Sequence, residues 1–319
     1  MIHHHTADQQ EHLMLPPQPD RVAIVTGGTD GIGFATARQL ARLGMRVIIA
    51  GNNDDKAQDV VRRLKQETLN DKVEFLHCDL GSLRSVRQFV QHFKEKKIPL
   101  HVLVNNDRLH VGHRNHRKHT GTGRMFQLAF RPGDQRVACT QDKAGVMMVP
   151  QRKTRDGFEE HFGVNYLGHF LLTCLLLEAL RASGAPGRHA RVVSVSSATH
   201  YVGELHLDDL QGRRGYSAHG AYAQSKLALV LFTYHLQRLL AAQGSPVTAN
   251  VADPGVVDTE LYRHVFWGTR LVQKVFSRWM FKTPDEGAWT SVYAAVAPDL
   301  EGIGGRYLYN EKETRSLPL

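Results

Sequence analysis

The sequence predicts an α/β protein built on one doubly wound, parallel β-sheet, and three observations support this. Short apolar runs alternate with segments in which apolar residues recur at helical spacing, as strands and amphipathic helices do. The connections between them are short, which is typical of a parallel sheet with helices on both faces. A chain of 319 residues, with 42% hydrophobic and 22% charged residues, suits one large globular domain. We therefore expect a Rossmann-like three-layer α/β/α fold, as a single domain over residues 21–319.

The first strand and helix are the best marked elements. Residues 22–25 are entirely apolar, and a glycine-rich turn follows them. After Gly33 the apolar residues recur at helical spacing until Gly44, which is typical of a helix end. A strand, a glycine turn and a helix N-terminus in this order bind anions, because glycines let the backbone approach a pyrophosphate. The spacing Gly27-x3-Gly31-x-Gly33 is weak evidence alone, since a turn that uses glycine only for packing looks the same.

The remaining elements follow in the same alternation. In the first part of the chain we expect strands at 46–50, 73–76 and 100–104, and helices at 57–69 and 82–93. In the second part we expect a helix at 159–180, a strand at 191–197, a loop at 199–220, a helix at 222–240, a strand at 247–252, amphipathic helices within 257–280, a helix at 287–297 and a last strand at 305–309.

Residues 107–143 interrupt this pattern. They hold eight Lys and Arg against three acids, and they show no apolar period. More than half of the net charge of +9 belongs to this segment, which argues against a general basic face and a nucleic-acid partner. We expect a basic, unstructured insertion, which is either looped out of the fold or an artefact of the gene model. Histidines recur there at every third position, but coincidence explains them better than zinc binding, and we predict no metal site: His110, His113, His116 and His119.

The ends and the cysteines bear on the compartment. Residues 1–20 are polar and proline-rich, without the basic start and apolar core of a signal peptide, so we expect a disordered leader. We find no apolar run long enough to span a membrane. The three cysteines are widely spaced and odd in number, which does not suggest a disulfide framework. These observations make a cytoplasmic location the default expectation.

Three polar residues in the second half of the chain suggest acid–base chemistry. Tyr222 and Lys226 are four residues apart on an expected helix, so they lie on one face. A tyrosine titrates near pH ~10 when unperturbed, and a neighbouring ammonium lowers its pKa toward a useful range. Ser197 lies at the end of the preceding strand, where its hydroxyl can hold a substrate oxygen. Each signal has an ordinary explanation, a surface ion pair or a strand-end turn, when it is taken alone.

The order of the motifs is specific where the single motifs are not. The chain carries, in sequence, Thr26-Gly27-x3-Gly31-Ile32-Gly33, Asp79-Leu80, Asn105-Asn106, Ala144-Gly145, Asn165, Ser197, Tyr222-x3-Lys226 and Pro254-Gly255. This series resembles the classical short-chain dehydrogenase/reductase family over residues 21–309, apart from the insertion. The residues around Asn165, Asp-Gly-Phe-Glu-Glu before it and Asn-Tyr-Leu-Gly-His-Phe from it onward, resemble the retinol-dehydrogenase-like branch.

The resemblance implies a nicotinamide cofactor and the residues that bind it. These are Gly27, Thr29, Gly31, Ile32 and Gly33 around the diphosphate, Asn52 after the second strand, Asp79 and Leu80 at the adenine, Asn106 near the ribose, Tyr222 and Lys226 at the nicotinamide ribose, and Pro254, Gly255 and Thr259 beside the nicotinamide amide. The choice between NAD and NADP stays open, because neither an acid nor an arginine directly follows the second strand.

The resemblance also implies a reaction. Tyr222 is expected to act as the general acid/base, Lys226 to lower its pKa, Ser197 to orient the substrate oxygen, and Asn165 to anchor a water for proton relay. We expect an NAD(P)-dependent oxidoreductase that interconverts an alcohol and a carbonyl on a bulky lipophilic substrate of retinoid, steroid or polyprenol type.

Three further expectations are less specific. Aromatic residues within 260–281 suggest either an apolar surface or a buried core helix. The resemblance implies peripheral contact with a membrane, of the endoplasmic reticulum or a lipid droplet, as one expectation. A homodimer is another. The alternative function is a catalytically impaired binding or regulatory protein, because the insertion splits the family's Asn-Asn-Ala-Gly motif.

Overall fold

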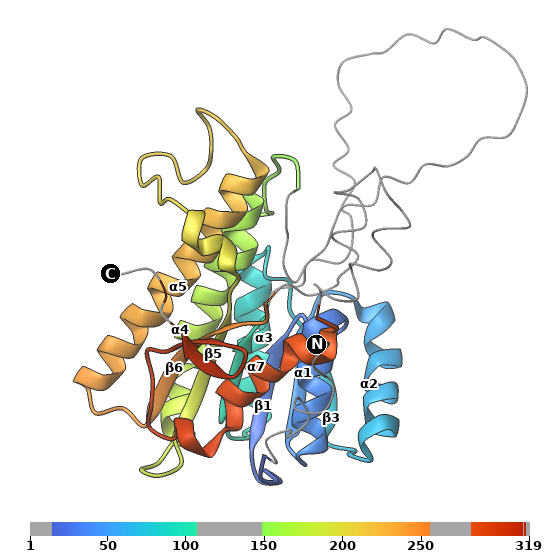
Figure 1. Cartoon of the computed structure of the whole chain (residues 1–319). Helices are drawn as coiled ribbons and strands as arrows, with labels where there is room; N and C mark the ends of the chain where they lie inside the picture. Colours follow the sequence, from blue (N-terminus) through green and yellow to red (C-terminus); the bar gives the residue numbers. More distant parts are fainter. Residues whose placement is uncertain (1–14, 107–148, 256–281, 315, 317–319) are drawn as a thin grey trace, which may run out of the picture.

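The computed structural model describes residues 15–106, 149–255, 282–314 and 316. Its centre is a single eight-stranded sheet in the order β3-β2-β1-β4-β5-β6-β7-β8, parallel except for the antiparallel β7–β8 pair (Figure 1). The strands are β1 (Val22–Thr26), β2 (Arg46–Gly51), β3 (Val73–His77), β4 (Val102–Asn105), β5 (Ala190–Val195), β6 (Val247–Asp253), β7 (Tyr307–Tyr309) and β8 (Lys312–Thr314). The predicted doubly wound α/β fold is confirmed.

Helices cover both faces of this sheet. They are α1 (Gly31–Arg42), α2 (Asp54–Thr68), α3 (Leu83–Glu95), α4 (His169–Ser183), α5 (Ala218–Ala242) and α7 (Pro284–Val296), with a π-helix, η1 (Phe162–Gly168), and two 3-10 helices, η2 (Ala198–Val202) and η4 (Pro298–Leu300). One core joins the sheet to α1, α2 and α7, and the other joins it to α3, α4 and α5. Along β1, Ala23 and Val25 belong to the first core and Val22 and Ile24 to the second. This burial on both faces explains why the central strands are continuously apolar.

The strand order reverses between β1 and β4, because β2 lies on one side of β1 and β4 on the other. In open α/β sheets such a reversal leaves a crevice at the carboxyl ends of the strands, where ligands bind. The expected site residues lie along this edge: the glycine turn follows β1, Asn106 follows β4, Ser197 follows β5 and Pro254 follows β6.

The expected helix at 159–180 differs from the structure in its first turns. Residues 162–168 form the π-helix η1, and a regular α-helix continues from His169. Two glycines let η1 pack closely: a Cβ on Gly168 would lie 2.5 Å from the Leu80 carbonyl oxygen, and one on Gly163 would lie 2.5 Å from Thr154. Regular helical periodicity does not reveal such a local widening.

Other boundaries also differ from expectation. The strand expected at 191–197 ends at Val195, the loop expected at 199–220 contains most of η2 and the first turn of α5, and β8 was not expected. The helices expected within 257–280 and the insertion 107–143 lie outside the described residues.

The described end of the expected leader contacts the domain. The Gln18 N–H donates to the Leu43 carbonyl at 2.6 Å, and Leu15 packs against the core that contains α1. Residues 15–20 therefore belong to the folded domain, which corrects the expected boundary at residue 20.

One helical stretch, Phe162–Ser183, is long and apolar enough to cross a membrane by length and composition alone. The criterion here is the mean hydropathy of the helix, which differs from the unbroken apolar run that the sequence lacks. Half of its most apolar window is buried, and Leu172, Leu176 and Leu180 pack in the core beneath the sheet. The apolar composition of this stretch is thus explained by its place in the core.

Candidate active site

The glycine turn leaves open space in front of the first turn of α1. Gly27 and Gly31 have φ angles of +62° and +54°, a region that side chains other than glycine rarely adopt. A Cβ on Gly31 would meet no atom within 4 Å, whereas a Cβ on Gly33 would lie 2.4 Å from the Gly27 carbonyl oxygen. Gly33 thus permits the tight turn, and Gly31 faces space that a phosphate can enter.

The end of β4 is fixed to the end of β1 by Asn106 and Thr26. The Asn106 N–H donates to the Thr26 hydroxyl at 2.9 Å, and its side-chain amide donates to the Thr26 carbonyl at 3.0 Å. The amide oxygen of Asn106 is buried and has no partner among the described residues. A buried acceptor without a partner is costly, so this atom fits a hydroxyl group of a bound ribose.

The expected adenine-side residues lie between β3 and η1. Asp79 is 9% exposed, and one of its carboxylate oxygens accepts the Gly81 N–H at 3.0 Å. Leu80 is buried, and its carbonyl is the group that Gly168 of η1 approaches. Asn52 is half-buried after β2, directly before Asn53, which caps α2. Thr29 and Ile32 complete the expected set, one half-buried in the glycine turn and the other packed against Ala288.

Tyr222 and Lys226 lie on the first turns of α5, and both are buried. The Lys226 ammonium donates to the carbonyl of Val195, the last residue of β5, at 3.1 Å, and lies 5.6 Å from the centre of the Tyr222 ring. Ser197 is half-buried two residues after Val195, and its hydroxyl oxygen accepts only a long contact of 3.4 Å from the Thr199 N–H. This arrangement puts a phenol, an ammonium and a hydroxyl at the end of one strand.

Asn165 is fully buried in η1 and joins two elements. Its side-chain amide donates to the Ser225 hydroxyl on α5 at 3.1 Å, and its carbonyl lies 3.0 Å from Nδ1 of His169. A carbonyl only accepts, so Nδ1 carries the proton, and Nε2 lies 2.9 Å from the Thr26 hydroxyl. His169, which sequence reasoning missed, therefore links η1 to the end of β1.

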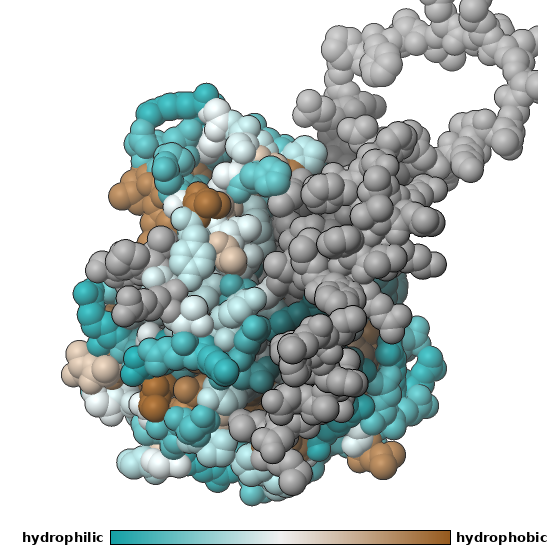
Figure 2. Space-filling model, viewed as in Figure 1, coloured by the Kyte–Doolittle hydropathy of each residue, from teal (hydrophilic) through white to brown (hydrophobic). Residues whose placement is uncertain are grey.

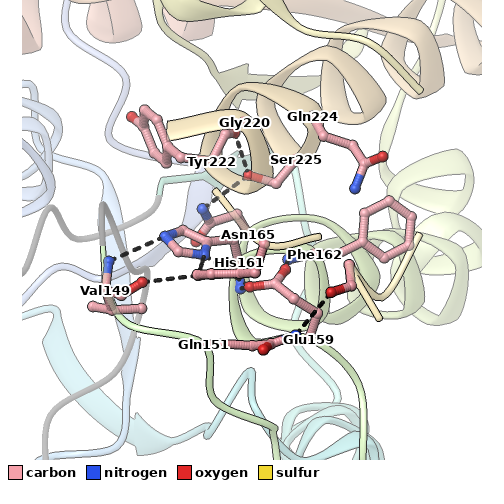
Figure 3. A network of polar contacts seen from close by, with 12 residues as sticks. Val149, Gln151, Glu159, His161, Phe162, Asn165, Gly220, Tyr222, Gln224 and Ser225 are labelled. Atoms are coloured by element: carbon pink, nitrogen blue, oxygen red, sulfur yellow. Dashed lines mark hydrogen bonds and ion pairs between the residues drawn. The ribbon is translucent and has the colours of Figure 1, made fainter. Parts of the chain in front are cut away.

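A second buried histidine, His161, fixes the chain beside Tyr222 (Figure 3). Its Nδ1 lies 2.8 Å from a Glu159 carboxylate oxygen, and its Nε2 accepts the Val149 N–H at 3.4 Å. Tyr216 donates its hydroxyl to the Val149 carbonyl at 2.8 Å. Burial, and then the negative charges of Glu159 and Glu160, raise the pKa of Tyr216, which keeps this donor protonated.

The His161 ring meets the Tyr222 ring edge to face, with centroids 6.2 Å apart. A cavity of about 370 Å³ lies beside Glu159 and Tyr216, which both line it. It is lined by residues of the segment before α5 and of the first turns of α5, among them Asp208, Asp209, Arg214, Ser217 and Gln224.

The turn after β6 is held by Asp253, the last residue of that strand. Pro254 is buried, Gly255 has a φ angle of +78°, and the Gly255 N–H donates to Asp253 at 2.9 Å. Thr259, the last expected cofactor contact, lies outside the described residues, as do Ala144 and Gly145 of the split motif.

Two features decide the class of protein. The sheet reverses its strand order beside a glycine turn, which is where open α/β sheets hold dinucleotides. A buried tyrosine–lysine pair lies on one helix at the same edge. The combination defines a dehydrogenase that works with a nicotinamide dinucleotide.

Comparison with known proteins gives the family. The model of the family described as short chain dehydrogenase matches residues 21–130 and 140–267, and the chain belongs to this family. Polyprenol dehydrogenase of Homo sapiens is 67% identical over 304 residues, which cover 95% of this chain and 81% of that protein. Retinol dehydrogenase 12 of Mus musculus is 40% identical over 289 residues, 91% of this chain and 77% of that protein. The predicted family, branch, enzyme class and NAD(P) cofactor class are confirmed.

A solved structure shares the fold at lower identity. The chain of the Pseudomonas aeruginosa RhlG/NADP active-site complex has a TM-score of 0.63 and 23% identity, over 92% of this chain and 95% of that one.

Proposed function

We propose that this enzyme interconverts an alcohol and a carbonyl group on a bulky lipophilic substrate of polyprenol type, with Tyr222 transferring the proton. The position of Lys226, fixed to Val195 and facing the Tyr222 ring, carries this proposal. The 67% identity to a polyprenol dehydrogenase favours an isoprenoid alcohol over a retinoid, for which the identity is 40%. The steroid that we also expected from the sequence has no support among these relatives.

The residues divide the work in a way that follows from their contacts. A nicotinamide bound at this edge of the sheet would supply the hydride chemistry between the alcohol and the carbonyl carbon. The Tyr222 phenolate takes the hydroxyl proton in oxidation, and the phenol gives it back in reduction. The Lys226 ammonium favours the ionised phenol because an opposite charge lies close to it. The Ser197 hydroxyl still has its hydrogen to donate, so it can orient the substrate oxygen.

Contacts at the two ends of residues 107–148 support the proposal that the split motif is compatible with a working site. On one side of residues 107–148, Asn106 is held by two hydrogen bonds to Thr26. On the other side, Val149 is held by its N–H on His161 and by its carbonyl on Tyr216. The two ends are thus fixed by hydrogen bonds to different elements of the described domain. These anchors favour the enzyme over a catalytically impaired binding or regulatory protein.

The proposed cofactor contacts are the described members of the predicted set. Gly27, Thr29, Gly31, Ile32 and Gly33 would hold the diphosphate, and Asn52, Asp79, Leu80 and Asn106 the adenosine half. Lys226 and the Pro254–Gly255 turn would hold the nicotinamide half. The open space at Gly31 and the unpartnered Asn106 oxygen support this assignment. We do not assign NAD or NADP. The first charged side chain after β2 is Asp54, and it is already paired with His77 at 3.1 Å.

A lipophilic substrate or a membrane surface is supported by exposed apolar side chains near Ser197. Val202 and Leu207 are 78% and 79% exposed in the segment between β5 and α5. On the face that Figure 2 shows, apolar residues form small separate groups among hydrophilic ones. Contact with a membrane and a homodimer remain predictions.

The test separates binding from chemistry. The melting temperature of the protein is measured with NAD, NADH, NADP and NADPH, because a ligand that binds the native state stabilises it by about 2.7 kcal/mol at 100 times its Kd. Tyr222→Phe should keep the cofactor-dependent shift and lose turnover of a polyprenol at least about 100-fold. A version without residues 107–143 serves as the control for the insertion. Absence of a shift in the full chain, with a shift in the shortened one, would contradict the proposed function.

A further inference from the structure

Asp253 is a buried carboxylate directly before the Pro254–Gly255 turn. Its side chain is at the end of β6, and the residue is 2% exposed. One carboxylate oxygen accepts the Gly255 N–H at 2.9 Å, and the other accepts the Tyr307 hydroxyl at 2.5 Å. Both oxygens of this side chain therefore act as hydrogen-bond acceptors.

The charge of Asp253 is hydrogen-bonded but not neutralised within the described part of the chain. Its partners there are a backbone amide and a phenol, and neither carries a charge. The Lys282 side chain lies beside the turn, because its aliphatic carbons would be 3.6 Å from a Cβ built on Gly255. Its ammonium donates to Asn310. A buried charge without an opposite charge favours any cation that comes close to it.

Two described side chains next to this carboxylate, Tyr307 and His200, are uncharged. Burial raises the pKa of Tyr307, and the negative charge of Asp253 raises it further, so the phenol stays protonated. Burial lowers the pKa of His200, which keeps the imidazole neutral at pH 7. His200 lies 3.4 Å from the Tyr307 hydroxyl and 2.8 Å from the Ser197 carbonyl, so Asp253 is coupled to the strand end that carries Ser197.

We propose that Asp253 makes the cofactor site discriminate between redox states, by binding the oxidised nicotinamide more tightly than the reduced one. This inference rests on the proposed function, which puts the nicotinamide at the Pro254–Gly255 turn. The oxidised ring carries a positive charge and the reduced ring is neutral, so a carboxylate beneath the turn attracts only the first. Hydride transfer from the alcohol removes that positive charge. Asp253 therefore stabilises the complex with the oxidised cofactor and gives no such stabilisation to the complex with the reduced one.

The experiment measures the Kd of the oxidised and the reduced cofactor by titration calorimetry, for the full chain and for Asp253→Asn. An asparagine keeps an oxygen for the Gly255 N–H and an amide for the Tyr307 oxygen, so it removes the charge and leaves the contacts. We expect the ratio of the reduced to the oxidised Kd to fall about tenfold, which corresponds to ~1.4 kcal/mol. Asp253→Ser, which also offers an acceptor to Gly255, replaces it if the asparagine variant does not fold.

Two variants separate charge from simple support of the turn. Tyr307→Phe removes a hydrogen bond and keeps the carboxylate, so it should preserve the preference for the oxidised form. Asp299→Asn makes the same change in another tyrosine–aspartate pair, with Tyr293, and should leave the ratio unchanged. A ratio that stays within twofold in Asp253→Asn, or falls equally in Tyr307→Phe, overturns this proposal alone. Failure of the unmodified chain to bind either form overturns the proposed function together with it.

Discussion

The two halves of the site are held together in different ways. On the cofactor side, from β1 to β4, the residues expected to touch the ligand also hold one another: Gly33 packs on Gly27, and Asn106 bonds to Thr26. On the reaction side, from η1 to β7, the expected residues depend on others. His161 supports the chain beside Tyr222, and His169 donates to the Asn165 carbonyl. Asp253 supports the turn after β6 by accepting the Gly255 N–H.

This difference shows which residues of a site a sequence motif can reveal and which it cannot. A motif that is self-supporting contains both the binding residues and their scaffold. A motif whose scaffold comes from distant residues shows only the groups that meet the ligand. Buried polar networks of the second kind are expected to be more sensitive to loss of one member, because an unpaired buried group keeps its full desolvation cost.

The largest expected effect is on the reaction side, at His161. His161→Phe leaves the Val149 N–H without its acceptor and removes the imidazole from the buried Glu159 carboxylate. We expect a loss of about 2–4 kcal/mol in the free energy of unfolding, measured by urea denaturation, with a parallel loss of turnover.

His206→Phe is the control for this variant, since His206 is exposed and its one ion pair with a described residue is a 3.9 Å contact with Glu204. It should change stability by less than about 0.5 kcal/mol. An equal effect of the two substitutions would mean that the His161 network does not support the fold.

A smaller effect on stability is expected on the cofactor side, at Gly33. Gly33→Ala puts a methyl group 2.4 Å from the Gly27 carbonyl and 2.5 Å from the Asn106 amide, so the turn must shift. Overpacking of this kind costs about 1–3 kcal/mol, and we expect the cofactor-dependent rise in melting temperature to disappear. Gly215→Ala, where a Cβ would meet nothing within 4 Å, should leave both quantities unchanged. A normal cofactor shift in Gly33→Ala would contradict the assignment of this turn.

The fold was predictable from the sequence because its signals are local. The strands of the first half, β1 to β4, are short apolar runs between helices of regular period, and their expected bounds lie within a few residues of those observed. The π-helix η1 was not predictable, since its register depends on how closely Gly168 approaches Leu80, two residues far apart in the chain. The spacing of apolar residues along the sequence does not reveal such a contact.

The residues proposed to face the ligand could be selected from the sequence, but the residues that support them could not. Tyr222, Lys226 and Ser197 could be found from their order along the chain, and the structure places them at one strand end. His161 and Asp253 carry no spacing signal of their own. The available hints were weak: an acid and a histidine two residues apart before Asn165, and an acid next to the Pro-Gly turn. Only the folded chain shows that both are buried.

The smallest expected effect tests the cofactor side by the loss of a single hydroxyl. Thr26→Val removes the group that contacts Asn106 and His169, and leaves the Asn106 N–H without an acceptor. Thr36→Val makes the same change on α1, where the buried hydroxyl has no partner within the described ranges. We expect a loss of about 1–2 kcal/mol for Thr26→Val and no loss for Thr36→Val, measured side by side by chemical denaturation. If both variants are neutral, the ends of β1 and β4 are held by packing alone. The two halves of the site would then also differ in the kind of interaction that stabilises each.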